Sequence, residues 1–210
     1  MVEKQENVFV EPVVVERDDV EEFNKGWLCN LGVRRSDGDV IIIADVDVVI
    51  PHERYLLELM SWKRAKGLRW CFGWNQLIYD GKDGKTPQRI DSPEPWIQEG
   101  GIVMFDRSLW ERMGGASEWL KKLRGCDNEL AFKARHLTAS YNGFPQTLHH
   151  SWHPISPMKK GKHRKHNKAI LEYMLKHPSE VISICKNEQW GSEDGPYCDK
   201  HSFYDVRVGK

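Results

Sequence analysis

Two carboxylates, Asp45 and Asp47, stand one residue apart at the end of the most apolar run in the chain, GDVIIIADVDVVIP (38–51). In open α/β sheets, ligands bind beyond the carboxyl ends of strands. Residues at i and i+2 of an extended segment point the same way, so we expect both carboxylates to face one ligand. Like charges placed together favour a cation, and a hard divalent ion such as Mg²⁺ or Mn²⁺ suits carboxylate and diphosphate oxygens. On spacing alone, a solvated Asp-rich turn is an equally good interpretation.

The composition limits the function classes. The chain has 210 residues, enough for one α/β domain, and Lys plus Arg equals Asp plus Glu at 31 each. No overall charge therefore favours nucleic acid, a membrane surface or an acidic partner. The longest apolar run is too short to span a bilayer, and the charged first residues (1–12) lack a signal-peptide core. The five cysteines include no Cys-x-x-Cys pair, which predicts reduced thiols in a cytoplasmic protein.

Strand and helix patterns alternate along the chain. We expect one or two short strands within 7–16, and a helix over 18–36 with carboxylates in its first turn and an apolar face that includes Phe23. The further elements expected are a strand at 40–44, a helix ended by Gly67, a strand at 69–79, a polar loop at 80–95, a strand at 100–105, a helix from Asp106 to Gly114 and a helix at 127–137. This alternation predicts an α/β fold with a mostly parallel sheet flanked by helices.

Three blocks of the sequence resemble glycosyltransferases of the GT-A fold, especially family-2-type enzymes and the galactosyltransferase and chondroitin-polymerase groups. FNKGWLCNLGVRRSDGDVIIIADVDVVIP (23–51) is similar to the segment that leads into their DxD motif. EGGIVMFDRSLWERMGGASEW with RGCDNELAFKARH resembles their Gly-Gly strand, the helix after it and their acidic acceptor motif. TLHHSWHP (147–154) resembles the segment with their late metal-binding histidine. The resemblance implies a single GT-A-like, Rossmann-like domain.

The resemblance also implies roles at the donor and metal sites. Asp47 would be a direct metal ligand and Asp45 would contact the sugar or ribose of a nucleotide-sugar donor. The metal would be Mn²⁺ or Mg²⁺, with His150 as the best late ligand and His153 and His149 as substitutes. Gly100 and Gly101 would let the backbone approach the donor, and Asn30 would also contact it. A UDP-sugar is the expected donor.

Acceptor binding is assigned to a different set of residues. The resemblance implies that Asp127 is the catalytic base and that Asp127 and Glu129 bind the acceptor, a carbohydrate or modified nucleic acid. Trp96 is a further acceptor-binding candidate, because aromatic faces often stack on sugars, although core packing explains the tryptophans here equally well. Asp127 and Glu129 are equally typical of the first turn of a helix, where carboxylates interact favourably with the macrodipole. Cys126 stands where the first acid of the usual Glu-Asp pair is expected.

The domain organisation departs from the resembled families at both ends. Only residues 7–16 precede the helix that contains Phe23, so the usual N-terminal nucleotide-binding strand is expected to be missing or supplied by an upstream segment or partner. We expect a transferase core at 1–154 and a basic extension at 155–210, whose segment 158–169 either covers the donor diphosphate, binds a polyanion or is a solvated surface.

Two alternative functions stay open on the sequence. A degenerate glycosyltransferase would bind a nucleotide sugar or carbohydrate without turnover. A ββα-metal, HNH-type nuclease is suggested by the histidines at 149–153 with His166 and Asn167, although it leaves the Asp-Val-Asp and Gly-Gly segments unexplained.

Overall fold

The computed structural model describes residues 10–15, 23–81, 88–91, 100–120, 125–138, 143–151, 163–187 and 190–193. The helices are α1 (Lys25–Arg35), α2 (Tyr55–Ala65), α3 (Arg107–Met113), α4 (Cys126–Thr138), α5 (His163–Lys176) and α6 (Pro178–Asn187). The strands are β1 (Val40–Ala44), β2 (Val48–Val49), β3 (Trp70–Phe72), β4 (Gln76–Tyr79), β5 (Gln88–Asp91), β6 (Ile102–Asp106) and β7 (Thr147–His150).

The strands form two small sheets, and the predicted mostly parallel sheet is wrong. One sheet has the order β1-β6-β3 and is antiparallel throughout. The other has the order β2-β7-β4-β5, in which only β4 and β7 run parallel. Because β1 and β3 both oppose β6, they run in the same direction, as a strand-helix-strand connection predicts. The later strand β6 inserts between them in the opposite direction and makes the ladders antiparallel.

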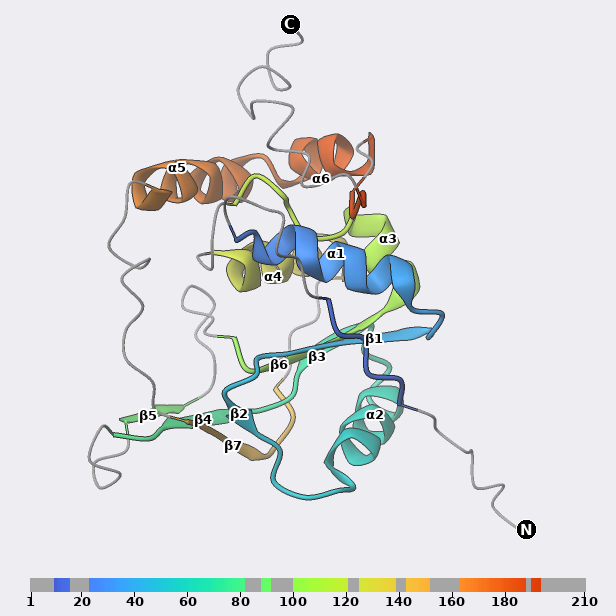
Figure 1. Ribbon diagram of the computed structural model, residues 1–210, viewed down its shortest axis with the longest axis vertical. Helices are drawn as coiled ribbons and strands as arrows, with labels where there is room; N and C mark the ends of the chain where they lie inside the picture. Colours follow the sequence, from blue (N-terminus) through green and yellow to red (C-terminus); the bar gives the residue numbers. More distant parts are fainter. Residues whose placement is uncertain are drawn as a thin grey trace, which may run out of the picture.

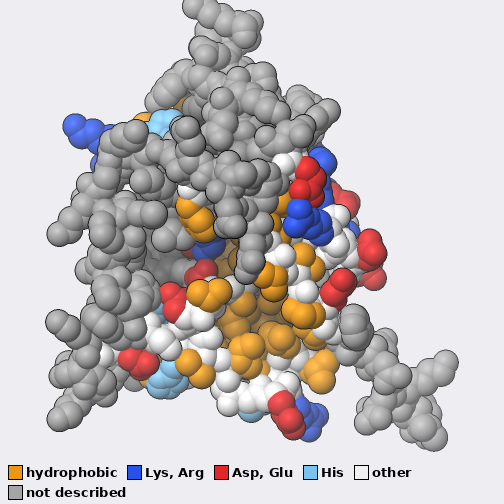
Figure 2. Space-filling view, viewed as in Figure 1, with side chains coloured by type: hydrophobic (Ala, Val, Ile, Leu, Met, Phe, Trp, Pro, Cys, Tyr) orange, Lys and Arg blue, Asp and Glu red, His pale blue; other side chains and the backbone are white. Residues whose placement is uncertain are grey.

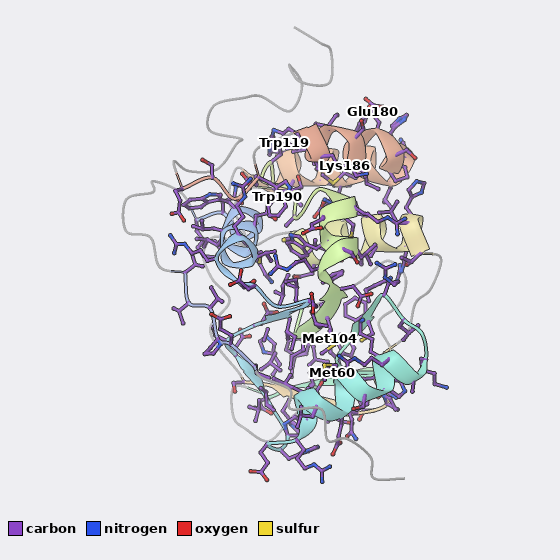
Figure 3. All side chains as sticks on the ribbon, turned by 90° about the vertical axis from the view of Figure 1, so that its right-hand side faces the viewer. Met60, Met104, Trp119, Glu180, Lys186 and Trp190 are labelled. Carbon is purple, nitrogen blue, oxygen red and sulfur yellow. The ribbon has the colours of Figure 1, made fainter. Side chains whose placement is uncertain are left out.

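Helices cover both sides of the β1-β6-β3 sheet (Figure 1). Helices α1, α3 and α4 lie over one face, α2 lies on the other side, and α5 and α6 pack on the outside of α3 and α4. In Figure 3, Met60 of α2 and Met104 of β6 lie close together between this helix and the sheet. Both are buried in the main apolar core. A second cluster joins α5 and α6 to Trp119 and Leu120.

Strand β1 lies at the edge of its sheet. Its only neighbour among the described strands is β6, and Val40, Ile42 and Ile43 are half-buried. Figure 2 shows apolar side chains gathered in a hollow over β1 and toward α2. No helix within the described ranges combines the length and the apolar composition that a membrane crossing requires.

Several predicted elements are confirmed, and one predicted strand is divided. The strand at 40–44, the α2 end at Gly67 and the α3 limits at Asp106 and Gly114 match the prediction, and Gly67 and Gly114 have φ angles of 65° and 73°. The predicted strand at 69–79 is two strands, β3 and β4, in different sheets. The expected loop at 80–95 contains β5.

Helix α1 begins later than its sequence pattern predicts. Asn24 caps it by accepting a hydrogen bond from the Trp27 amide at 2.9 Å, and its first turn contains no acidic residue. Trp27 is buried as expected, whereas Phe23 is exposed. Residues 10–15 form no strand, and 16–22 lie outside the described residues.

The N-terminal part of α1 is fixed by buried hydrogen bonds to residues 116–118. The Asn30 side chain accepts from the Ala116 amide at 2.7 Å and donates to the Ala116 carbonyl at 2.8 Å and to Glu118 Oε1 at 2.9 Å. Asn24 Nδ2 donates to the Glu118 carbonyl at 2.6 Å. A Cβ on Gly26 would lie 2.3 Å from the Ser117 carbonyl oxygen, so glycine permits this close approach.

We expect Asn30→Ala to lower the free energy of unfolding by about 3 kcal/mol, because buried polar groups of Ala116 and Glu118 would lose their partner. Urea denaturation monitored by circular dichroism measures this loss. Arg34→Ala, on the exposed side of the same helix and over the Trp190 ring, should cost less than about 1 kcal/mol. Equal losses in the two variants would contradict the role assigned to Asn30.

Candidate active site

The antiparallel ladder of β1 and β6 brings Asp45 opposite Gly101. The ladder pairs Ala44 with Ile102, and the next residues continue it, because the Asp45 amide donates to the Gly101 carbonyl at 2.8 Å. The Asp45 side chain contacts the same residue, because its Oδ2 accepts a hydrogen bond from the Gly101 amide at 2.7 Å. The pairing of β1 with β6 therefore brings together two sequence blocks that lie about fifty residues apart.

Lys25, the first residue of α1, connects Asp45 to Asp127. Its Nζ lies 2.8 Å from Asp45 Oδ1 and 2.9 Å from Asp127 Oδ1. Asp127 lies in the first turn of α4, so residues from three elements converge. Sequence reasoning assigned Lys25 no role. The sequence pattern predicts a helix that begins at residue 18, with Lys25 in its interior; only the observed start at Lys25 puts this cation at a helix N-terminus, where it opposes the macrodipole.

The charges at this cluster shift the pKa values of its members. Burial raises the pKa of Asp127 above its ordinary value and the Asp45 carboxylate adds to the shift, while the Lys25 ammonium opposes it. Burial by itself lowers the pKa of Lys25, but Asp127 and Asp45 together raise it well above its usual range. A carboxylate with a raised pKa is a stronger base.

Gly100 and Gly101 leave room for this arrangement. A Cβ on Gly100 would lie 1.9 Å from Asp45 Oδ2 and 3.4 Å from Asp127 Oδ2. Gly101 has a φ angle of 95°, and a Cβ there would lie 2.9 Å from Trp74 Nε1. Trp74 is fully buried and donates to the Gly100 carbonyl at 3.1 Å, so it supports the turn rather than offering a surface for sugar stacking.

Asp47 has different partners from Asp45. The chain turns at Val46 and Asp47, and the Val48 amide donates to the Asp45 carbonyl at 3.2 Å. Side chains alternate only along extended backbone, so the alternation argument for two carboxylates facing one ligand does not apply in this turn, and their shared ligand stays a prediction. Asp47 Oδ1 instead lies 3.3 Å from His150 Nε2.

In the β2-β7-β4-β5 sheet, His150 faces Asp47 and its neighbour His149 does not. The β2–β7 ladder places His150 opposite Val48, and the Ser151 amide donates to the Asp47 carbonyl at 2.7 Å. Successive residues of a strand face opposite sides. His150 therefore faces Asp47 and contacts Tyr79 with ring centroids 4.5 Å apart and the ring planes tilted by 35°, while the exposed His149 lies 3.8 Å from Asp80 Oδ1. His153 lies outside the described residues.

The tautomer of His150 fits a metal ligand. His150 Nδ1 lies 3.0 Å from the Ser151 carbonyl oxygen, which can only accept, so Nδ1 carries a hydrogen. In the neutral imidazole, Nε2 then has its lone pair toward the Asp47 carboxylate, and two acceptors at this distance favour a proton or a metal ion between them. Within the described residues, no group of three or more His, Cys, Asp or Glu side chains is gathered for a metal. Asp47 and His150 thus fit a site whose other ligands come from a bound diphosphate and water.

Two of the predicted site residues that the structure describes, Asn30 and Glu129, are not brought into this cluster. Asn30 and Glu129 have no exposed surface, so neither has surface to offer a donor or an acceptor. Asn30 holds residues 116–118, and Glu129 pairs with Lys133 while its Oε2 accepts from the Ser117 amide at 3.2 Å. Burial raises the pKa of Glu129, and Lys133 opposes that shift. Trp96 lies outside the described residues.

Two of the residues that suggested a nuclease, His166 and Asn167, lie in helix α5. Asn167 is 2% exposed, and His166 Nε2 lies 3.2 Å from the Trp119 carbonyl oxygen. These contacts fix α5 to the body of the protein and disfavour a nuclease site. The expected boundary at 154/155 and most of the basic segment 158–169 lie outside the described residues or in the first turns of α5, so both assignments stay predictions.

Comparisons with known proteins give coarse likenesses only. No protein-family model matches the chain, and no curated protein does. The mannosyltransferase PcManGT from Pyrobaculum calidifontis, in complex with GDP-Man and Mn²⁺, is 16% identical over 77% of this chain and 51% of its own, with a TM-score of 0.43. The catalytic domain of Drosophila beta1,4galactosyltransferase 7, in complex with xylobiose, is 19% identical over 64% and 48%, with a TM-score of 0.34.

The chain spans about half the length of these two solved structures. At such identities and TM-scores, a function has to be inferred from the site itself.

We expect Gly100→Ala to lower the free energy of unfolding by about 1 to 3 kcal/mol, because the added methyl group would displace the Asp45 carboxylate from the Gly101 amide. Gly38→Ala is the matched control, since a Cβ on this exposed glycine would make an ordinary 3.5 Å contact with the Val40 carbonyl oxygen. Urea denaturation of both variants provides the comparison. Gly100→Ala as stable as Gly38→Ala would show that Asp45 is not held as described.

Proposed function

We propose that this chain is the core of a metal-dependent glycosyltransferase that moves a sugar from a nucleotide-sugar donor to an acceptor hydroxyl. The observation that carries the proposal is the convergence of Asp45, Gly100–Gly101 and Asp127 around Lys25. These residues come from separate sequence blocks, and those same blocks carry the resemblance to GT-A enzymes. In this proposal, a donor-side carboxylate and a base for an acceptor lie on two sides of one lysine, and the two glycines leave room for the Asp45 carboxylate and for Trp74.

Asp47 and His150 would hold the metal in this proposal. A divalent cation bound there would neutralise the diphosphate of the donor and stabilise the charge on the leaving nucleotide. The chain would bind the metal through one carboxylate and one imidazole, a combination that suits Mn²⁺ better than an all-oxygen site does. A UDP-sugar is the donor we propose, with a carbohydrate or modified nucleic acid as acceptor.

Asp127 would take the proton from the acceptor hydroxyl. Its pKa is raised by burial and by Asp45, which strengthens it as a base, and the Lys25 ammonium keeps its ionised form accessible. Cys126, where the resembled families carry another acid, has a thiol pKa raised by its hydrogen bond to Cys29 and by burial, so it stays neutral. Asp127 is thus the base we assign in an inverting transfer.

The direct test is turnover of a panel of nucleotide sugars, UDP-sugars first, with Mn²⁺ and with chelator. We expect metal-dependent release of nucleoside diphosphate from at least one donor. Binding without turnover across the panel would instead indicate a carbohydrate or nucleotide-sugar binding module, and cleavage of plasmid DNA would indicate a nuclease.

Asp47→Ala and His150→Ala should each abolish the Mn²⁺-dependent part of UDP or GDP binding, because each removes a metal ligand. Asp45→Asn should weaken that binding less, since it removes hydrogen bonds and no metal bond. Calorimetric titration with and without Mn²⁺ measures both effects. His149→Ala, on the opposite face of β7, is the matched control, and a loss there equal to that in His150→Ala would argue against this metal site.

Asp127→Asn should lower turnover by about 10²- to 10⁴-fold while donor affinity changes little, because a positioned general base contributes to the chemical step. Wild-type kcat should fall on the acid side with a midpoint above the ordinary Asp pKa of about 3.9, since the raised pKa requires a higher pH for ionisation. Asp37→Asn, at an exposed position, is the control. Full activity of Asp127→Asn in a less stable protein would mean that Asp127 serves the helix alone.

A further inference from the structure

We infer that Lys25 is the positioning residue of this site: its one ammonium group holds the donor-side carboxylate of Asp45 and the acceptor-side carboxylate of Asp127 in fixed relation to each other. The inference rests on the proposed function. Lys25 acts in it only through its two partners.

The geometry leaves each carboxylate little freedom. Lys25 Nζ contacts Oδ1 of Asp45 at 2.8 Å and Oδ1 of Asp127 at 2.9 Å, and the three side chains are only 14%, 25% and 17% exposed. The second oxygen of Asp45 accepts from the Gly101 amide. Charge-assisted hydrogen bonds of this length are the strong ones, particularly where water is mostly excluded. Asp127 is thus tied, through one cation, to a carboxylate that the sheet backbone already fixes.

The position of Lys25 has an electrostatic cost that these contacts offset. It is the first residue of α1, where the helix dipole is positive, and no acidic residue lies in that first turn. A residue that opposes a local preference is typical of functional sites. The compensating charges come from Asp45 and Asp127, which lie 20 and 102 residues further along the chain.

Buried hydrogen bonds fix the backbone that carries Lys25. Asn24, the residue before it, caps α1 and donates to the Glu118 carbonyl, and Asn30 in the next turns binds Ala116 and Glu118. Since α1 cannot shift against residues 116–118 without breaking these bonds, the ammonium stays where both carboxylates reach it.

Lys25 supplies the positive charge among the described groups that face Asp127. Asp45 faces it from the turn after β1, and Cys126 and Glu129 belong to the same helix. Cys126 is neutral and Glu129 is paired with Lys133. Removing the charge of Lys25 would leave Asp127 beside another carboxylate in a partly buried site without its compensating cation, so Asp127 would take up a proton more readily.

The test compares Lys25→Met, which removes the charge at similar length, with Lys25→Arg, which retains it. We expect Lys25→Met to lower kcat by about 10²-fold, the effect of misplacing a reacting group by roughly 1 Å. The fall of its kcat at acidic pH should occur at a higher pH than in wild type. In Lys25→Arg, kcat should fall at the same pH as in wild type, and most of the wild-type kcat should be recovered. Mn²⁺-dependent UDP binding should persist in both variants, because it depends on Asp47 and His150.

The matched control is Lys66→Met, at an exposed lysine after α2, which should behave as wild type. Lys25→Gln is a second neutral variant in case Lys25→Met does not fold. A loss of kcat that is equal at every pH, or that Lys25→Arg does not relieve, would overturn the inference, because it would indicate a general structural role.

A measurement without turnover separates this inference from the proposed function. Carbon-13 NMR should show a higher Asp127 carboxyl pKa in Lys25→Met or Lys25→Gln than in wild type, with the signal assigned by its loss in Asp127→Asn. An unchanged pKa would overturn the inference even if the enzyme is active. The expected pKa rise in a protein that turns over no donor would support the positioning by Lys25 and contradict glycosyl transfer.

Discussion

The antiparallel register between β1 and β6 is the constraint on which the site depends. Each residue of β1 has one partner in β6, and the ladder runs on past Ala44 to join Asp45 to Gly101 through the main chain. A slip of one residue would turn every side chain of β1 to the other face of the sheet. The same register therefore buries Ile41 of β1 and places the Asp45 carboxylate at the Gly101 amide.

The second constraint is charge compensation between Lys25, Asp45 and Asp127, which connects helices α1 and α4 to the end of β1. Lys25 and Asp127 begin α1 and α4, and they meet Asp45 at the end of β1. One cation with two carboxylates leaves the cluster with a net negative charge when all three side chains are ionised. The hydrogen bonds of Asn24 and Asn30 to residues 116–118 keep the cation in place.

Each of the two sheets contributes part of the proposed site. The β1-β6-β3 sheet supplies Asp45 and Gly101, and the β2-β7-β4-β5 sheet supplies His150 to Asp47. The turn at Val46 and Asp47 is the short connection between the two sheets. Asp45 therefore lies beside the first sheet and Asp47 beside the second. In the proposed function, two acids one residue apart can serve the donor and the metal separately because the backbone between them is not extended.

The sequence by itself determined the elements with strong local signals: the apolar strand at 40–44, the α2 and α3 ends at Gly67 and Gly114, and Asp45, Asp47, Gly100, Gly101 and Asp127 as candidates. Only the tertiary structure decided strand direction, because β6 enters between β1 and β3 through contacts distant in sequence. It also showed that Asn30 and Glu129 are buried in hydrogen-bonded networks and that Lys25 joins Asp45 to Asp127. Local patterns specify an element and its faces, whereas the partner of a buried charge is chosen by which distant segments packing brings within a few ångströms.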